Sequence, residues 1–230
     1  MTAQIDHLVV AASTLDEGVD WCERTLGITP GPGGEHPLMG THNRLFSIAT
    51  AQYPKIYFEI IAINPGAAHA CIQGAKRWFD LDNSALQRQL EQNGPQLIHF
   101  VASTPRASAA VNALSQLGLD RGVLLPASRM TASGLLSWQI TVRKDGQRLM
   151  NGALPTLIEW GDVHPSDGMA ASGVTLESLS VTLPNPVELS AAYDAIRLKG
   201  VTLTDQPDEG SAHLLARLHT PLGPVTLKSC

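Results

Sequence analysis

The sequence has few cysteines and no block of positive charge, and each shortage excludes a class of protein. Its three cysteines, Cys22, Cys71 and Cys230, lie far apart, so they indicate neither a disulfide framework nor a cysteine-based metal site. We therefore expect a reducing compartment, the cytoplasm. The net charge is -5 and the pI is near 5.9, with no run of Lys and Arg. This charge pattern argues against nucleic acid as a partner.

The sequence also lacks long apolar runs. None approaches the roughly 18 consecutive apolar residues that a membrane helix needs. The start of the chain has neither the basic nor the apolar region of a signal peptide. We expect no membrane partner and no secretion. Of the 230 residues 43% are apolar and 16% are charged, which suffices for a sizeable core in one large domain or two small ones.

A short, β-prone stretch with one histidine occurs twice. The first copy is Ile5-Asp6-His7-Leu8-Val9-Val10 and the second is Leu97-Ile98-His99-Phe100-Val101-Ala102. Each copy is followed by a helical pattern that ends at a Leu-Gly pair, with Gly27 and Gly118 as the expected left-handed caps. The two stretches therefore predict two equivalent halves of one domain.

Each half also has one glutamate in a later apolar strand. Glu59 falls within a predicted strand over 55–63, and Glu159 occupies the same place in a predicted strand over 155–161. The pattern of strand, helix and three strands is thus repeated, which indicates an internal duplication.

These four residues suggest a common site. A buried carboxylate is costly unless it is paired or bound to a metal. If the halves pack about a pseudo-two-fold axis, His7, Glu59, His99 and Glu159 converge as two imidazoles and two carboxylates. Such a set suits a divalent metal ion such as Ni, Co, Fe, Mn or Zn. A metal there would polarise a carbonyl and stabilise an enediolate, while a displaced carboxylate, Glu59 or Glu159, acts as the catalytic base.

Two alternatives to a metal site stay open. A single strand histidine is commonly a hydrogen-bonded core residue rather than a ligand. The four groups would also fit a pocket in which they hydrogen-bond to one another.

The repeat divides the chain into four parts. Residues 1–65 form a first module, 66–95 a helical connection, and 96–165 a second module. A third, shorter copy covers 173–230, where Ser178 stands in place of the histidine and the closing strand has no carboxylate. We expect this degenerate third module to act as scaffold, edge cover or partner-binding unit.

Three further residues are candidates for binding substrate. Asn43 follows a loop rich in Gly and Pro, and a neutral amide is buried at lower cost than a charge. Arg129 lies just before a predicted strand, where its guanidinium could bind a carboxylate or phosphate. Trp138 lies in mid-strand and could form a cleft wall. The alternatives are a turn residue, an exposed arginine and a core tryptophan.

Strand alternation gives expectations for other side chains. Trp160 alternates away from Glu159, so we expect it to pack under the helices. We expect the loop histidines His36 and His164 to be solvated, with His164-Pro165 shaping a turn.

The repeated unit resembles the vicinal oxygen chelate superfamily over about residues 4 to 165. This resemblance is carried by Ile5-Asp6-His7-Leu8-Val9, Leu26-Gly27 and Phe58-Glu59-Ile60. Within the superfamily the chain is similar to bacterial glyoxalase-like domain proteins, through Gly40-Thr41-His42-Asn43-Arg44-Leu45, Ser128-Arg129, Leu136-Ser137-Trp138, Leu157-Ile158-Glu159-Trp160-Gly161 and His164-Pro165.

The resemblance implies an α+β fold of paired βαβββ modules, whose curved mixed sheets enclose a cleft. Metal ligands in such proteins come from the first and last strands of each module, which carries onto His7, Glu59, His99 and Glu159. This set is similar to that of bacterial lactoylglutathione lyases. Two departures are that the glyoxalase-like subgroup often has another residue at the position of His99, and that no cluster of basic residues for glutathione is evident here.

We therefore expect a metal-dependent glyoxalase-like lyase or isomerase that acts on a small α-oxygenated molecule through an enediolate or enolate. One alternative is a non-enzymatic binder, like the drug-sequestering members of the superfamily, although 5% aromatic residues weakly disfavours a stacking pocket. Another is an extradiol-type dioxygenase, although such enzymes generally use two histidines and one glutamate. A homodimer is expected because superfamily members often dimerise and exposed sheet edges need covering.

Overall fold

The computed structural model describes residues 2–67, 74–131, 134–206 and 210–229. Cys71, Cys230 and part of the predicted connection over 66–95 lie outside these ranges. Cys22 is a buried free thiol. None of the helices in the described ranges is long and apolar enough to cross a lipid bilayer.

The predicted repeat unit occurs twice, and a third group of strands follows. The first module consists of β1 (Gln4–Ala11), α1 (Leu15–Leu26), β2 (Glu35–His36), β3 (Thr41–Ser47) and β4 (Tyr57–Ile63). The helix α2 (Ser84–Asn93) then leads into the second module, which consists of β5 (Gln96–Ser103), α3 (Ala107–Ser115), β6 (Val123–Thr131), β7 (Gly134–Val142), η1 (Met150–Gly152), β8 (Thr156–Trp160) and η2 (Pro165–Gly168). The third group consists of β9 (Thr175–Leu183), α4 (Val187–Ile196), β10 (Val201–Asp205), β11 (His213–Thr220) and β12 (Gly223–Lys228).

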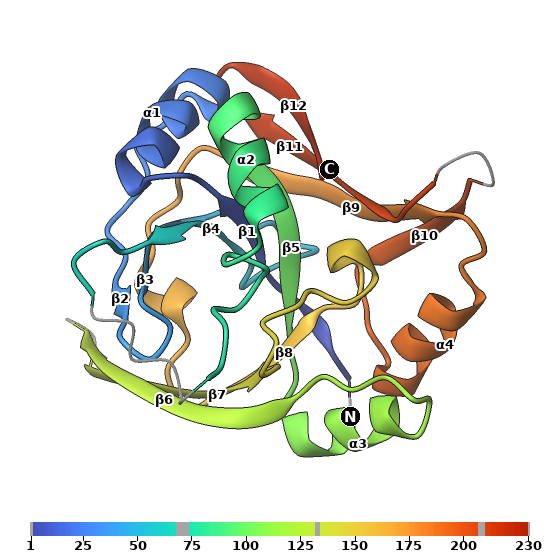
Figure 1. The fold of residues 1–230 in the computed structure, drawn as a ribbon. Helices are drawn as coiled ribbons and strands as arrows, with labels where there is room; N and C mark the ends of the chain where they lie inside the picture. Colours follow the sequence, from blue (N-terminus) through green and yellow to red (C-terminus); the bar gives the residue numbers. More distant parts are fainter. Residues whose placement is uncertain (1, 68–73, 132–133, 207–209, 230) are drawn as a thin grey trace.

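The first two modules share one curved, mixed sheet of eight strands, in the order β2-β3-β4-β1-β5-β8-β7-β6 (Figure 1). The first strands of the two modules, β1 and β5, pair antiparallel at its centre, and each pairs in parallel with the last strand of its own module. The remaining strands form a separate sheet in the order β10-β9-β11-β12. The α+β fold with curved mixed sheets, predicted from the sequence, is confirmed.

The two faces of the large sheet have different cores. One face, which we call the helix face, carries residues such as Leu8 and Phe58 and packs against α1, α3, α4 and the four-stranded sheet. The other, the cleft face, carries Val9 and Ile61. Its apolar cluster includes Phe79, Leu81, Leu86 and Leu90, from α2 and the segment before it. The third group of strands therefore covers the helix face, and α2 with its preceding segment covers part of the cleft face.

The element β6 was not predicted as a strand. Arg129 was expected just before a strand, whereas it lies within β6, which pairs antiparallel with β7. Pro126 lies within β6, and proline usually argues against a central strand. Since β6 is the last strand of the sheet, Pro126 is tolerated there.

Helix α1 packs closely against β4. It begins after Thr14, whose side chain accepts a hydrogen bond from the Glu17 N–H. A Cβ atom at Gly18 would collide with Cγ2 of Ile60 and lie 3.2 Å from Cβ of Ala12. Glycine at this position therefore permits the close approach of helix and strand.

Gly18→Val is expected to lower the free energy of unfolding by about 1–3 kcal/mol, because it overpacks this contact. The control is Gly210→Ala, where an added Cβ meets no atom within 4 Å. That change should stay within about 0.5 kcal/mol of the parent. Urea denaturation followed by circular dichroism measures both values. An unchanged stability of Gly18→Val would contradict the close packing of α1 on β4.

Candidate active site

The candidate site begins at an irregularity in β1. Ile5 faces Ala102 and His7 faces Val101, so Asp6 is an extra residue in this strand. Side chains that follow each other in a regular strand point to opposite faces, and a bulge breaks this alternation. As a result Oδ1 of Asp6 lies 2.7 Å from Nδ1 of His7. Asp6 was not predicted as a site residue, because nothing in the local sequence pattern around it signals the bulge.

Asp6 is buried and accepts several side-chain hydrogen bonds. Among its partners are Nδ1 of His7 at 2.7 Å, Nε1 of Trp160 at 2.9 Å and Nε2 of His164 at 3.0 Å. The Nδ1 atom of His164 accepts from the Ser166 N–H, so its Nε2 donates to Asp6. Burial alone would raise the pKa of Asp6, but the hydrogen bonds from His164 and His7 lower it well below its usual value. Asp6 is therefore a buried, ionised carboxylate.

His7 connects Asp6 to Glu59. Nδ1 of His7 donates to Asp6, so the other nitrogen of the His7 ring, Nε2, is the one that faces Glu59. It lies 3.5 Å from Oε2 of Glu59. The other oxygen of Glu59, Oε1, accepts a hydrogen bond of 2.6 Å from Nδ2 of Asn43. The Gly34 N–H donates to Oδ1 of Asn43 and so fixes the orientation of the amide. The structure thus brings together three of the predicted site residues, His7, Glu59 and Asn43.

Two histidines that were expected to be solvated belong to this region instead. Nε2 of His36 lies 3.4 Å from Nδ2 of Asn43, and its Nδ1 lies 3.0 Å from Oγ1 of Thr41. Burial, together with the positive charge of Arg129, lowers the pKa of His36 to about 3, so its ring is neutral. His164 is buried against Asp6. The prediction that His164 is solvated is therefore wrong, whereas His36 is half-buried.

Aromatic side chains surround His7 and Glu59. Tyr57 stacks on His7 with ring centroids 4.5 Å apart. The cavity at these residues, of about 40 Å³, is also lined by Phe79, Arg129 and three of the four tryptophans, Trp78, Trp138 and Trp160. Trp138 and Arg129 therefore lie at the cleft, where their predicted roles would require them. Trp160 lies there too, so the expectation that it packs under the helices is wrong.

His99 lies on the same face of the sheet but does not reach this cavity. It is fully buried, and its Nδ1 donates to the Gly152 carbonyl at 2.9 Å. Its Nε2 accepts from the Thr156 N–H at 3.1 Å. The ring of Phe79 lies 5.2 Å from the His99 ring. Burial and the nearby charge of Arg121 lower the pKa of His99 well below its usual value. His99 is therefore a neutral, hydrogen-bonded core residue.

Glu159 points to the helix face. Its Oε2 accepts a hydrogen bond of 2.7 Å from the Ala107 N–H, the first residue of α3. The first N–H groups of a helix have no partner within it, and its N-terminus favours negative charge. Glu159 thus serves as a cap for α3.

Strand register explains why Glu59 and Glu159 are not equivalent. Two residues after His7, Val9 faces Glu59 across β1 and β4. Two residues after His99, Val101 faces Thr156 across β5 and β8. The position equivalent to Glu59 is therefore Thr156. Glu159 lies three residues further on, and an odd shift along a strand moves a side chain to the opposite face.

The predicted four-ligand metal site is not assembled in the part of the chain that the structure describes. His7 and Glu59 face each other, while His99 and Glu159 are engaged elsewhere. No group of three or more His, Cys, Asp or Glu residues is placed to hold a metal ion within the described ranges. Two ligands, one of them already bonded to Asn43, do not fit a site of four.

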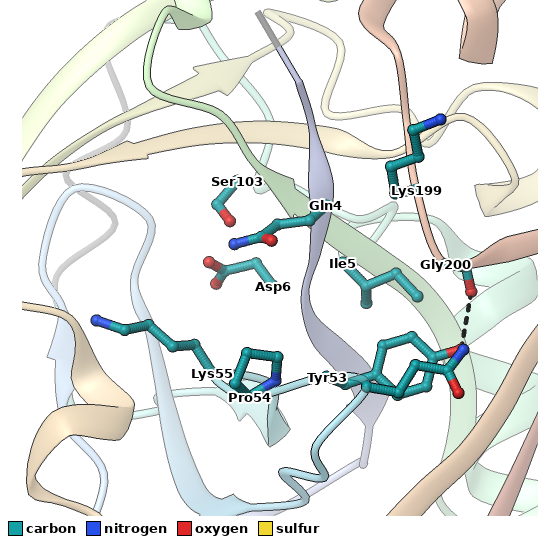
Figure 2. Close-up of a pocket in the computed structure, with 10 residues that line it drawn as sticks. Gln4, Ile5, Asp6, Tyr53, Pro54, Lys55, Ser103, Lys199 and Gly200 are labelled. Atoms are coloured by element: carbon teal, nitrogen blue, oxygen red, sulfur yellow. Dashed lines mark hydrogen bonds between the residues drawn. The ribbon is translucent and has the colours of Figure 1, made fainter.

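A separate cavity of about 260 Å³ lies near the start of β1 (Figure 2). Asp6, Lys55 and Lys199 are among its lining residues. Lys55 pairs with Asp167 at 2.9 Å, and the Tyr53 hydroxyl donates to the Gly200 carbonyl. His7 and Glu59 line the cleft and not this cavity, so the cleft is the better candidate for chemistry.

Comparisons with known structures support the fold. A hypothetical protein from Staphylococcus aureus aligns with 99% of this chain and 85% of its own, at 14% identity and a TM-score of 0.58. A methylmalonyl-CoA epimerase from Streptomyces coelicolor aligns with 71% of this chain and 99% of its own, at 18% identity. Its TM-score of 0.43 is too low to carry an argument. No curated protein matches the chain.

A family model gives the assignment. The model of the glyoxalase-like domain matches residues 5–197, which span both βαβββ modules and extend past α4. The resemblance to the vicinal oxygen chelate superfamily is thereby confirmed. On this match and on the fold, the chain belongs to the glyoxalase-like domain family.

Proposed function

We propose that this protein is an enzyme of the lyase or isomerase class that moves a proton at a carbon next to a carbonyl group, with Glu59 as the base. The observation that supports this proposal most directly is a buried series of side-chain contacts at the cleft, in which Asp6 contacts His7 and His7 contacts Glu59. A general base must lie within reach of the proton that it removes, and Glu59 lines the innermost cavity.

The neighbours of Glu59 support this role. Asn43 binds Oε1, which leaves Oε2 directed towards His7 and the cavity. Asp6 holds Nδ1 of His7, so Nε2 of His7 is the nitrogen that faces Glu59. A proton taken by Glu59 would be shared between Oε2 and Nε2 and then returned to the substrate. The product of the first step is an enolate or enediolate, as the sequence predicts for a small α-oxygenated substrate.

Aromatic residues favour a second candidate function. They make up 5% of the chain, yet Tyr57, Trp78, Phe79, Trp138 and Trp160 all line the innermost cavity. Such walls suit a protein that sequesters a small molecule without reaction. Binding without proton exchange would favour this second function over the enzyme.

Glu59→Gln is expected to slow proton exchange by about 100-fold or more, because general base catalysis contributes at least this factor. Exchange is followed in deuterated water by proton NMR, as loss of the signal next to the carbonyl in a panel of 2-hydroxy ketones, 2-hydroxy aldehydes and 2-oxo acids. Glu159→Gln is the matched control, since Glu159 caps α3. It should cost about 1 kcal/mol of stability and leave the exchange rate unchanged. Equal exchange by the parent and Glu59→Gln would refute Glu59 as the base.

Metal binding tests the rest of the predicted site. Of the four predicted ligands, only His7 and Glu59 lie at the cleft, so we expect less than one equivalent of Mn, Co, Ni or Zn after dialysis. Mass spectrometry of the metal content measures this. His99→Ala should leave the metal content unchanged but destabilise the fold by about 1–3 kcal/mol, because it leaves buried groups of Gly152 and Thr156 unpaired. If the parent binds one equivalent of metal, and both His7→Ala and His99→Ala lose it, that result would support the four-ligand site predicted from the sequence.

A further inference from the structure

Arg129 lies where three cavities of the cleft meet. It lines the innermost cavity with His7 and Glu59, and also two larger cavities of about 420 and 550 Å³. Its Nε and Nη1 atoms are buried and have no hydrogen-bond partner within the described ranges. None of the ion pairs between described residues includes Arg129. Arg129 as a whole is half-buried, and these two donors, which have no protein partner within the described ranges, are available for an anionic ligand.

Trp78 adds a further donor in the same place. It lines the innermost cavity and the 420 Å³ cavity, both of which it shares with Arg129. Its Nε1 atom is buried and has no partner among the described residues. Two independent side chains, one from β6 and one from the segment before α2, thus present unpaired donors to the same part of the cleft.

The position of Trp78 is set by a strained turn. Phe79 and Asp80 follow it with φ of 59° and 60°, in the left-handed region that bulky residues rarely adopt. The turn is held because Asp80 accepts from Nε of Arg148 at 3.0 Å and donates its N–H to the Gly146 carbonyl at 2.9 Å. Backbone strain that the surroundings maintain is concentrated at functional sites. This strain therefore supports a functional role for Trp78.

The ligand group that fits these donors is a carboxylate. A guanidinium binds a planar carboxylate through parallel N–H donors, and an indole N–H supplies one more. His36 lines the same two cavities as Arg129 and Trp78, and its ring is neutral, so it does not repel the guanidinium. Glu59 is bonded to Asn43, and no described carboxylate pairs with Arg129.

The 420 Å³ cavity indicates the rest of the ligand. Its lining is mostly apolar, and Leu38, at 45% exposure, lies at its edge. The apolar lining residues are Pro37, Leu38, Met39, Leu125, Pro126, Ala127, Trp138, Ile140 and Val142. A cavity of this size and composition suits a branched aliphatic or aromatic group.

We propose that the substrate is a 2-oxo acid with an apolar side chain, which rests on the proposed role of Glu59. Its carboxylate binds Arg129 and Trp78, and its side chain occupies the 420 Å³ cavity. Glu59 removes a proton from the carbon next to the keto group, and the C–H electron pair forms the enolate double bond as the keto oxygen gains negative charge. Return of that proton to the enolate oxygen completes a keto–enol isomerisation and regenerates Glu59, so no further reactant is needed, and return of a solvent proton to carbon appears as exchange at C3.

Tryptophan fluorescence tests the carboxylate subsite without catalysis, because three of the four tryptophans line the cleft. The probes are 3-phenylpropanoate and its uncharged amide. The parent is expected to bind the acid at least tenfold more tightly than the amide. Arg129→Met should remove this preference, and Arg129→Lys should retain part of it. Arg88→Met, which removes an exposed positive charge on α2, should leave the preference intact.

Any one of three results would overturn the carboxylate subsite. The first is equal binding of the acid and the amide to the parent, and the second is a tenfold preference that persists in an Arg129→Met variant shown to be folded by circular dichroism. The third is competition by inorganic phosphate that is as strong as competition by the acid. If Arg129→Met does not fold, Arg129→Lys and the acid-to-amide comparison on the parent still decide the question.

A separate measurement distinguishes this subsite from the proposed function. Exchange at the C3 position of 4-methyl-2-oxopentanoate in deuterated water is followed by NMR. Glu59→Gln should bind the acid as the parent does but lose exchange. If the parent binds the acid selectively but catalyses proton exchange in no compound of the panel, the carboxylate subsite is supported and the catalytic role of Glu59 is refuted. Exchange of this substrate with no acid preference would refute the subsite alone.

Discussion

The buried carboxylate of Asp6 is the interaction on which the candidate active site depends. It accepts hydrogen bonds from His7 in β1, from Trp160 in β8 and from His164 just before η2. An unpaired buried charge is very costly, and these donors stabilise the ionised carboxylate in this position. The same contact that orients His7 towards Glu59 therefore joins the first module to the second.

The two modules share one sheet, but among the described residues the first module alone brings its predicted histidine and glutamate together at the cleft. In the first, His7 faces a carboxylate, Glu59. In the second, His99 faces the hydroxyl of Thr156 at the equivalent position, and both histidine nitrogens are satisfied within the core. The third group of strands has Ser178 at the corresponding place and covers the helix face of the sheet.

Local patterns predicted most of the elements, because apolar alternation and helix caps depend on neighbouring residues alone. They also identified His7, Glu59 and Asn43, which do lie together. Other features depend on strand pairing, so local patterns could not predict them. One is the bulge that turns Asp6 towards His7, and another is the odd shift in register that places Glu159 on the helix face and Trp160 at the cleft. A third is the edge position of β6, which allows that strand to contain a proline. The strained turn at Trp78 likewise depends on distant partners, Arg148 and Gly146.

The most direct test of the account is the protonation state of the histidine rings around Asp6. Long-range nitrogen–proton NMR spectra of protein labelled with 15N-histidine report which nitrogen of each ring carries a proton. We predict a proton on Nδ1 of His7 and a neutral His164 that carries its proton on Nε2. Both protonation patterns should be lost in Asp6→Asn. A His7 ring protonated only on Nε2, or spectra unchanged in Asp6→Asn, would contradict it.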